Sequence, residues 1–248
     1  MNNQNQNWAW HLDVLASSPS TNAELKSRLK SEQASIGSAL LTRCQTNGRG
    51  RLERSWISPP GNIALSAVVP GEAKAYQLSL LAGLSLQRTL AQKIGLKCQI
   101  KWPNDLLIKK RKLAGILCEA VPDKQAVVVG FGINYESLNM DFPEELRPMI
   151  ATVSEFTKLK LSAKDFAMAL LDSFQADWLR YNTLGLEALL PEILENFAFL
   201  GQNVTVTEAS EPPYAARVKG LTPEGFLIIE MANGSVRQLV AGDVRGES

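Results

Sequence analysis

The sequence predicts an α+β protein in which a mixed β-sheet, flanked by helices, is followed by a small C-terminal β-barrel. Two observations support this class. Between 99 and 134, strand-like runs follow one another after a long apolar helix, which indicates an antiparallel or mixed sheet rather than a doubly wound one. Between 201 and 244, four short strand-like runs alternate with Pro, Gly and Asn, as in small barrels. We therefore expect two domains, 1–199 and 200–248.

Strands are expected where short apolar runs are bounded by turn residues, as Pro70 and Gly71 bound the run before them. The strands expected in the first domain are 10–15, 38–44, 62–69, 99–102, 105–108, 113–121 and 125–134. Those expected in the second domain are 201–208, 214–221, 225–231 and 235–244. The intervening segments 45–55, 103–104 and 109–112 lack apolar periodicity and are predicted as loops or turns.

Helices are expected where longer apolar patterns follow a capping residue. Thr21 and Glu24 have the spacing of a capping box, Gly95 is a natural helix terminator, and Ser162 is a natural N-cap. The helices predicted are one that begins near Asn22, then 76–94, 162–184 and 185–198.

Composition excludes several classes of protein. With 45% hydrophobic and 21% charged residues, the 248-residue chain is not a disordered protein. No apolar run approaches the ~18–20 residues that a bilayer requires, and the polar N-terminus is not a secretory signal. The net charge of +1 excludes a globally basic nucleic-acid coat. We therefore expect a cytoplasmic protein.

The counts of histidine and cysteine exclude further chemistry. His11 is the only histidine, so a multi-histidine metal site is impossible and any His-based triad would depend on His11 alone. Cys44, Cys98 and Cys118 are widely spaced and odd in number, so neither a C-x-x-C pair nor a disulfide framework is expected. Unpaired thiols fit a reducing compartment.

Positive charge is concentrated in two segments. Residues 43–54 carry a net charge of +3 and residues 97–112 carry +5, so the rest of the chain must carry −7. Two basic loops in an otherwise acidic protein indicate an anionic ligand, although solvated, flexible turns would have the same composition.

Three segments hold candidate binding residues. The loop NGRGR (47–51) combines glycines with arginines that can clamp a phosphate, but it is neither a P-loop nor a dinucleotide-binding fingerprint. The segment 101–112 places lysines around a carboxylate, an arrangement that could hold an anion or Mg²⁺, while its Pro-Asn-Asp could equally be a plain turn. The glycines of GFGIN (130–134) would let a flat ring lie against the backbone, although a glycine bend is the commoner explanation.

Taken together and in order, five motifs resemble the bacterial biotin–protein ligase family: STN (20–22), QTNGRGR (45–51) with Trp56, KWPND (101–105), RKLAGIL (111–117) and GFGIN (130–134). The resemblance runs from about Ser18 to Gly242. It implies a catalytic domain of the class II synthetase and biotin ligase type, followed by an SH3-like barrel. Too few residues precede STN for the winged helix of the transcription-repressing members, so we expect a ligase-only form with no DNA partner.

The family reaction has two steps. The biotin carboxylate attacks the α-phosphate of MgATP to give biotinyl-5′-adenylate and pyrophosphate, and a lysine of a biotin carboxyl carrier domain then attacks the adenylate. The resemblance therefore implies ATP, Mg²⁺ and biotin with no tightly bound prosthetic group. It implies as partner the carrier domain of a biotin-dependent carboxylase such as acetyl-CoA carboxylase, no membrane, and a monomer or homodimer.

The resemblance also assigns roles to residues. The implied catalytic residues are Lys112, Arg49 and Lys101, with Lys112 placed between the biotin carboxylate and the phosphate. The implied biotin-binding residues are Ser20, Thr21, Asn22, Gln45, Arg49, Gly50, Arg51, Lys112 and Gly115. Those implied for ATP or the adenylate are Arg49, Arg51, Trp56, Lys101, Asn104, Asp105, Lys112 and Asn134, in which Trp56 stacks near adenine and Asn134 reads it. Asp105 is the implied Mg²⁺ ligand.

One departure and two alternatives remain. Glu53 stands where the family commonly has glycine, so it could slow closure of the loop or pair with Arg51 or Arg54. A lipoate or octanoate–protein ligase of the same superfamily is the nearest alternative, but that family usually lacks KWPND. A non-catalytic polyanion-binding module is the other, and it would show strongly salt-sensitive binding.

Overall fold

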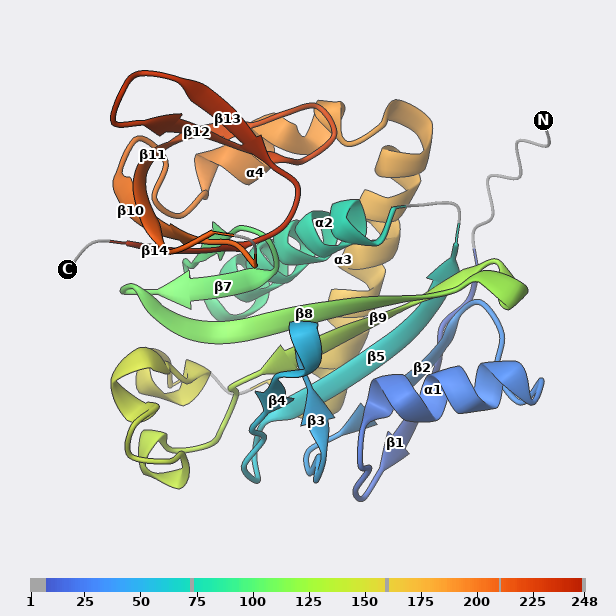
Figure 1. Ribbon diagram of the computed structural model, residues 1–248. Coiled ribbons are helices and arrows are strands. Elements are labelled where there is room, and N and C mark those ends of the chain that lie inside the picture. The colour runs from blue at the N-terminus through green and yellow to red at the C-terminus, as the bar shows by residue number, and fades with distance from the viewer. Residues whose placement is uncertain (1–7, 72–73, 159–160, 210, 247–248) are drawn as a thin grey trace.

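The structure, a computed structural model, describes residues 8–71, 74–158, 161–209 and 211–246 (Figure 1). It contains a seven-stranded sheet, a five-stranded sheet and a two-stranded hairpin. Helices lie on both faces of the larger sheet, and the C-terminal strands form a separate cluster above it in the view of Figure 1. The predicted α+β class is confirmed.

The larger sheet is mixed. Its strands in spatial order are β1 (His11–Leu15), β2 (Ser38–Thr42), β5 (Ile63–Pro70), β9 (Ala126–Ile133), β8 (Arg111–Val121), β7 (Asp105–Ile108) and β6 (Gln99–Lys101). Only β1 and β2 run parallel, and every other neighbouring pair is antiparallel. The central strands β5, β7 and β9 coincide with apolar runs in the sequence because they are largely buried, whereas the edge strand β1 is half-exposed to exposed.

Three long helices form where they were predicted: α1 (Thr21–Lys30), α2 (Ala75–Thr89) and α3 (Ala163–Leu184). A π-helical turn extends α2 to Ile94, and Gly95 ends it with a φ of 73°. Ser162 caps α3 by accepting a hydrogen bond from the amide of Asp165 at 3.1 Å. Within the described residues, no helix is long and apolar enough to span a bilayer.

The helices form two layers around the larger sheet. Leu41, Leu65 and Val129 belong to the main apolar core, which also includes the buried faces of α2 and α3. Leu40 and Val128, which point to the other side of the same strands, pack against α1 in a smaller cluster. Burial on both faces explains why these strands are continuously apolar rather than alternating.

The start of α1 differs from the prediction. Ser20, rather than Thr21, is the N-cap, and its Oγ accepts a hydrogen bond from the amide of Ala23 at 3.4 Å. Thr21 is the first helical residue, so the helix begins one residue before Asn22. Both Thr21 and Asn22 are buried against the sheet, which removes Thr21 from the capping position.

Two other predictions were only partly right. The helix predicted over 185–198 is shorter: a 3₁₀ turn (Glu187–Leu189) leads into α4 (Leu190–Glu195). The chain leaves the helix because the backbone at 196–198 hydrogen-bonds to Ile100 of β6. The turn predicted over 109–112 is confined to its first two residues, since Arg111 and Lys112 already belong to β8.

The segment 45–55 is more ordered than the predicted loop. It forms a hairpin of β3 (Gly48–Arg49) and β4 (Ser55–Trp56) around a 3₁₀ turn (Arg51–Glu53). The strands are only two residues long, and the turn exposes Leu52 to 76%. Figure 1 shows this hairpin in front of β8 and β5, so it covers the sheet rather than extending it.

The C-terminal strands form an antiparallel sheet with five strands instead of the predicted four, because the run 235–244 is broken at Gly242. In spatial order they are β13 (Val236–Leu239), β12 (Leu227–Met231), β11 (Tyr214–Leu221), β10 (Asn203–Thr207) and β14 (Asp243–Gly246). The two sheets share no strand, yet Val204 and Leu84 belong to one continuous core. The division into domains at 199/200 stays a proposal.

Candidate active site

The predicted site residues come together around two adjoining cavities between the larger sheet and the hairpin β3–β4. The first cavity, about 140 Å³, is lined by every predicted residue except Lys101 and Asn134. The second, about 430 Å³, is lined by Lys101 and Asn134. The residues common to both cavities are Arg54, Ser55, Trp56, Asp105, Lys112 and Asp243. Segments separated by more than 100 residues therefore build one site.

One end of the first cavity carries neutral polar groups. Ser66 Oγ lies 2.7 Å from Thr21 Oγ1 and 2.6 Å from Asn22 Oδ1, to which its hydroxyl donates. The Thr21 amide donates to Gln45 Oε1 at 3.0 Å. The Asn22 amide nitrogen donates to Glu119 Oε2 at 2.8 Å, which fixes the orientation of the side chain. This end presents hydroxyl and amide groups whose positions are set before any ligand arrives.

Glycine at 130 is required by this packing. A Cβ at that position would overlap the side-chain amide of Asn22. Because Asn22 comes from α1 and Gly130 from β9, the glycine allows the helix and its amide to approach the strand closely.

A flat ring lies against the second glycine of GFGIN, and it belongs to Trp56. A Cβ at Gly132 would lie 2.5 Å from Trp56 Cε2, and one at Gly115 would lie 3.1 Å from Cζ3. The Nζ of Lys112 lies 5.4 Å from the centre of the indole, within cation–π range. The indole nitrogen is buried without a hydrogen-bond partner in the described structure. Since Trp56 lines both cavities, its ring separates them.

The other end of the first cavity is charged. Lys112 Nζ lies 2.7 Å from Asp105 Oδ1, which is buried and accepts no hydrogen bond in the described structure, so the contact is an ion pair alone. Lys101 Nζ lies 3.6 Å from Asp105 Oδ2 and 2.7 Å from Asp243 Oδ1. Two lysines therefore flank one carboxylate.

The backbone of Lys112 is held in place from two sides. Its carbonyl accepts hydrogen bonds from the amide of Ala151 at 2.9 Å and from Asn134 Nδ2 at 3.3 Å. The register between β7 and β8 also shifts next to it, because Leu107 pairs with Lys112 while Leu106 pairs with Ala114. Such a bulge re-aims the side chains beside it. The β-bulge therefore directs the side chain of Lys112 toward the cavity.

The side chain of Asn134 is hydrogen-bonded to other groups of the protein. It is buried, and its Nδ2 contacts the carbonyls of Lys112 and of Ala151, the latter at 3.2 Å. Its Oδ1 accepts a hydrogen bond from Asn62 at 3.1 Å. These contacts give Asn134 a role in positioning Lys112, and its reading of adenine stays a prediction.

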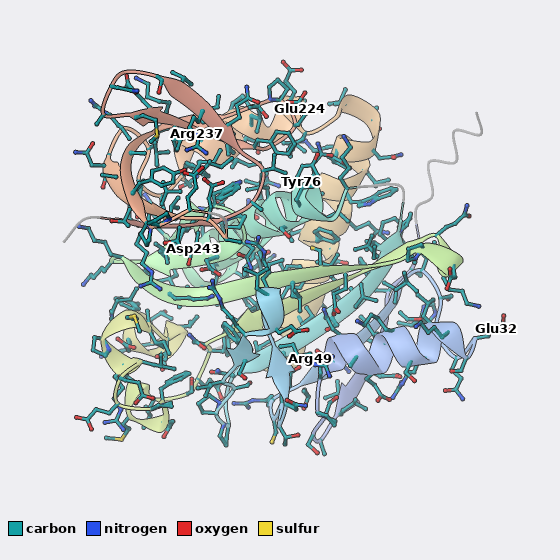
Figure 2. The ribbon with its side chains drawn as sticks, in the orientation of Figure 1. Glu32, Arg49, Tyr76, Glu224, Arg237 and Asp243 are labelled. Atoms are coloured by element: carbon teal, nitrogen blue, oxygen red, sulfur yellow. The ribbon has the colours of Figure 1, made fainter. Side chains whose placement is uncertain are left out.

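The arginines of the hairpin differ in burial. Arg49 is exposed at the hairpin, as Figure 2 shows, and Arg54 is 62% exposed in its side chain. Arg51 is half-buried and its Nη1 lies 3.4 Å from Asn104 Oδ1. Burial lowers the pKa of the Arg51 guanidinium, while the charges of Asp105 and Asp243 act in the opposite direction. Arginine remains protonated despite this, so a fixed positive charge lies at the cavity.

The second cavity combines cations with apolar walls. Its cations are Arg54, Lys101, Lys110, Lys112 and Arg245. Its carboxylates are Asp105 and Asp243. Its apolar side chains are Trp56, Ile57, Leu107, Phe142, Leu146, Pro148, Met149, Ile150, Phe199 and Val244. This combination suits a ligand with a flat, weakly polar ring and several negative charges.

Several site residues were missed from the sequence. Ser66, which lines the first cavity, carried a local signal as a hydroxyl in the middle of an otherwise apolar buried run. Glu119 lines neither cavity but orients Asn22, and it is a charged residue near the end of such a run. Asp243 carried no signal, because only the fold brings it to Lys101.

Two comparisons with protein families match the chain. Residues 14–134 match the Biotin/lipoate A/B protein ligase family, and residues 199–245 match the Biotin protein ligase C terminal domain.

Curated relatives match almost the whole chain. The bifunctional ligase/repressor BirA of Bacillus subtilis is 30% identical over 241 residues, which cover 94% of this chain and 72% of that protein. The biotin--[acetyl-CoA-carboxylase] ligase of Mycobacterium tuberculosis is 30% identical over 242 residues, which cover 94% of this chain and 88% of that protein.

Solved structures agree. The biotin protein ligase from Aquifex aeolicus in complex with biotin and ATP superposes with a TM-score of 0.84 at 27% identity, over 95% of this chain and 99% of that one. The same protein without ligand gives a TM-score of 0.80. On its sequence, its fold and the residues gathered at its cavities, the chain belongs to the biotin protein ligase family.

Proposed function

We propose that this protein uses ATP to join biotin, through biotinyl-5′-adenylate, to a lysine of a biotin carboxyl carrier domain such as that of acetyl-CoA carboxylase. The observation that carries the proposal is the polarity of the first cavity. Ser66, Asn22 and Gln45 form a neutral hydrogen-bonding end, and Arg51 and Lys112 form a cationic end. Biotin has the same polarity, with a neutral ureido ring at one end and a carboxylate at the other.

The first step joins two anions, so it needs positive charge at the point of attack. A carboxylate oxygen of biotin attacks the α-phosphorus of ATP, and the bond to the bridging oxygen breaks so that pyrophosphate leaves with the electron pair. Lys112 is placed to donate to the carboxylate and the phosphoryl oxygens, with Arg49 and Lys101 as further donors. Charge donors held in advance by the protein stabilise such a transition state at no cost of reorganisation.

ATP is proposed to occupy the second cavity. Its triphosphate would meet Lys101 and Arg245, and its base would lie against apolar walls such as Phe142 and Met149. Trp56 stands between the two cavities, where it can contact the adenylate that spans them. Asn104 and Asp105 complete the nucleotide side in this proposal.

The residues present fit a magnesium ion that is held mainly by the nucleotide. The described residues contain no group of three or more acidic, histidine or cysteine side chains that could hold a metal alone. Asp105 nevertheless offers a buried carboxylate oxygen, Oδ1, that accepts no hydrogen bond and that an ion could take once its ion pair with Lys112 opens. Mg²⁺ commonly takes one or two carboxylates and completes its shell with phosphate and water oxygens. Asp105 is the proposed protein ligand, and the ion would neutralise charge on the triphosphate.

One incubation tests the proposed function. The protein, ATP, Mg²⁺ and biotin are combined with a biotin carboxyl carrier domain, and intact-mass measurement should show one added biotinyl group. A lipoyl domain with lipoate or octanoate in place of biotin is the control for the related ligase activity. If only the lipoyl domain gains mass, the protein is a lipoate or octanoate ligase. If neither does while polyanion binding falls steeply with salt, it is a binding module.

A further inference from the structure

A third cavity adjoins the proposed biotin site and shares no lining residue with the ATP cavity. It measures about 170 Å³ and shares Arg51, Pro103, Asn104 and Leu117 with the first cavity. Its remaining walls come from α2, from the turn after β6, from Cys118 of β8, and from Gly225 and Val240 in segments that connect the C-terminal strands. Figure 2 shows Tyr76 at the start of α2, below that sheet. The substrates proposed above leave this cavity unassigned.

The chemistry of this cavity differs from that of the other two. Its walls include the rings of Tyr76 and Trp102, the hydroxyl of Ser79 and the side chain of Val240. None of its described lining residues is a carboxylate, and Arg51 is their only cation. A triphosphate or pyrophosphate is better matched by the five cations of the ATP cavity, and a metal ion would find no charged ligand here. Aromatic and apolar walls suit an aliphatic chain.

We propose that this cavity admits the side chain of the carrier lysine and delivers its amine to the adenylate beside Arg51. The inference rests on the proposed function, which requires a lysine on a folded protein to reach a carbonyl that the hairpin covers. A lysine suits the walls because its four methylenes can lie against the aromatic rings that line the cavity while its nitrogen reaches the shared end.

The charge of Arg51 supports this assignment. A neighbouring cation lowers the pKa of an amine, and only the neutral amine is a nucleophile. The lysine first gives up one proton to solvent. Its nitrogen lone pair then attacks the biotinyl carbonyl carbon, a C–N bond forms, and the bond from that carbon to the phosphate oxygen breaks. AMP leaves with the electron pair, and the second proton lost from nitrogen completes the amide.

Val240 allows this cavity to be narrowed without touching the core. It lines the third cavity immediately after β13, and it is 61% exposed. Val236, at the opposite end of β13, is also 61% exposed and does not line that cavity. Val240→Trp and Val236→Trp therefore add the same bulk to the same strand region, and neither change buries a polar group.

The two half-reactions are measured separately in the full-length protein. Biotin-dependent exchange between pyrophosphate and ATP reports the first step, and single-turnover transfer from the preformed adenylate complex to the carrier domain reports the second. We expect Val240→Trp to slow transfer by about tenfold or more with exchange within about twofold of the wild type, because the lysine is misplaced while the adenylate is not. Val236→Trp should leave both rates within about twofold.

Three results would overturn the inference. Normal transfer in Val240→Trp means that the lysine uses another route. Equal loss of exchange and transfer means that the cavity serves the first step. Equal slowing of transfer in both variants means that the carrier merely touches this strand region. Failure of the proposed function itself is distinct, because the wild type would then show no biotin-dependent exchange at all.

Discussion

Lys101 and Asp243 connect the two sheets across the active site: the Nζ of Lys101 donates to Oδ1 of Asp243 at 2.7 Å, although 142 residues separate them. Asp243 also lies 3.6 Å from the guanidinium of Arg54 in the hairpin. Burial alone would raise the pKa of the Asp243 carboxyl, but the charge and hydrogen bond of Lys101, together with the charges of Arg54 and Arg245, outweigh burial and lower the pKa. One carboxylate from the C-terminal sheet thus helps to fix a lysine of the proposed ATP site.

Asp243→Asn should weaken the use of ATP more than the binding of biotin. The change leaves Lys101 with only Asp105, so the lysine loses its closest ionic partner and its fixed position. Loss of one charged partner typically costs about 1–3 kcal/mol, so we expect the apparent KM for ATP to rise by about tenfold. ATP titration of carrier biotinylation measures this. Asp123→Asn, the same change on an exposed turn, is the matched control. An unchanged KM in Asp243→Asn would show that the pair does not order the nucleotide site.

The ion pair of Lys101 with Asp243 should continue to stabilise the fold at acidic pH. An unfolded aspartate titrates near pH 3.9, and the pKa of Asp243 is lower than usual in the folded protein. Its stabilisation is therefore fully present above the unfolded value and is lost only as the pH falls through the folded value. Thermal unfolding of the wild type and Asp243→Asn from neutral pH to about pH 3 should show a difference that is constant above about pH 5 and shrinks below pH 4. A difference that disappears already at pH 6 would contradict this.

Lys112→Ala should depress adenylate formation by about 100-fold or more, because a preorganised charge donor is lost. The side chain is 37% exposed, so the fold should survive, although Asp105 loses its closest cation. Pyrophosphate exchange measures the first step, and Lys93→Ala, at an exposed position on the last turn of the helix that α2 begins, is the control. A normal rate of exchange in Lys112→Ala would show that this lysine does not act in adenylate formation.

The fold class could be predicted because local sequence patterns indicate most of the helices and strands. Apolar runs marked the strands of the larger sheet, and Gly95 and Ser162 marked a helix end and a helix start. The errors arose where long-range packing decided the outcome. Burial of Thr21 against Ser66 moved the cap of α1 to Ser20, and pairing of the chain near 197 with Ile100 ended α4 early.

Only the sequence motifs of the site could be predicted. The resemblance named the segments that meet, but not the contacts that they make. The sequence left open whether the glycines of GFGIN admit a flat ring or only bend the strand. In the structure the indole of Trp56, from a segment over 70 residues earlier, lies against Gly132. The ion pair of Lys101 with Asp243 crosses between two sheets, and no local pattern contains it.

Removal of the C-terminal sheet should harm turnover more than biotin affinity. Residues beyond 200 supply Asp243 to the site, whereas the neutral end of the biotin cavity is built by α1, the larger sheet and Gln45, all from the first 199 residues. Trp102 donates to the carbonyl of Gly225 at 3.2 Å, so truncation also uncovers a buried ring and should lower stability. A folded 1–200 fragment should bind biotin but biotinylate the carrier poorly. Normal carrier biotinylation by that fragment would show the sheet to be dispensable.

The hairpin over 45–56 should be cut by trypsin without ligand and protected with it. Its two short strands offer few contacts, and four charges in so short a span cannot bury enough surface to hold it rigid. Arg49 and Arg54 are exposed and should be cut faster than the half-buried Arg51. Mass mapping of fragments with and without biotin and ATP tests this, with cleavage elsewhere in the chain as the internal control. Equal cutting of the hairpin in both samples would refute it.

Glu53→Gly should modestly lower the apparent KM for ATP, and the effect should shrink at high salt. Glu53 has a φ of 59° and Leu52 has a φ of 54°, so both adopt the left-handed conformation that glycine accepts without strain. In the described structure Arg51 hydrogen-bonds to Asn104, and Arg54 lies near Asp243. Neither arginine forms an ion pair with Glu53 there. The unpaired carboxylate should repel a triphosphate by a small, salt-screened amount, about 1 kcal/mol or less.

Leu52→Gly separates the two causes, because it relieves the same backbone conformation without removing a charge. ATP titrations of carrier biotinylation at low and high ionic strength should show a salt-dependent decrease in KM for Glu53→Gly. Leu52→Gly should show a change that salt does not affect. Equal, salt-independent changes in the two variants would assign the whole effect to the backbone. An unchanged or raised KM for Glu53→Gly at low salt would mean that this carboxylate points away from the nucleotide.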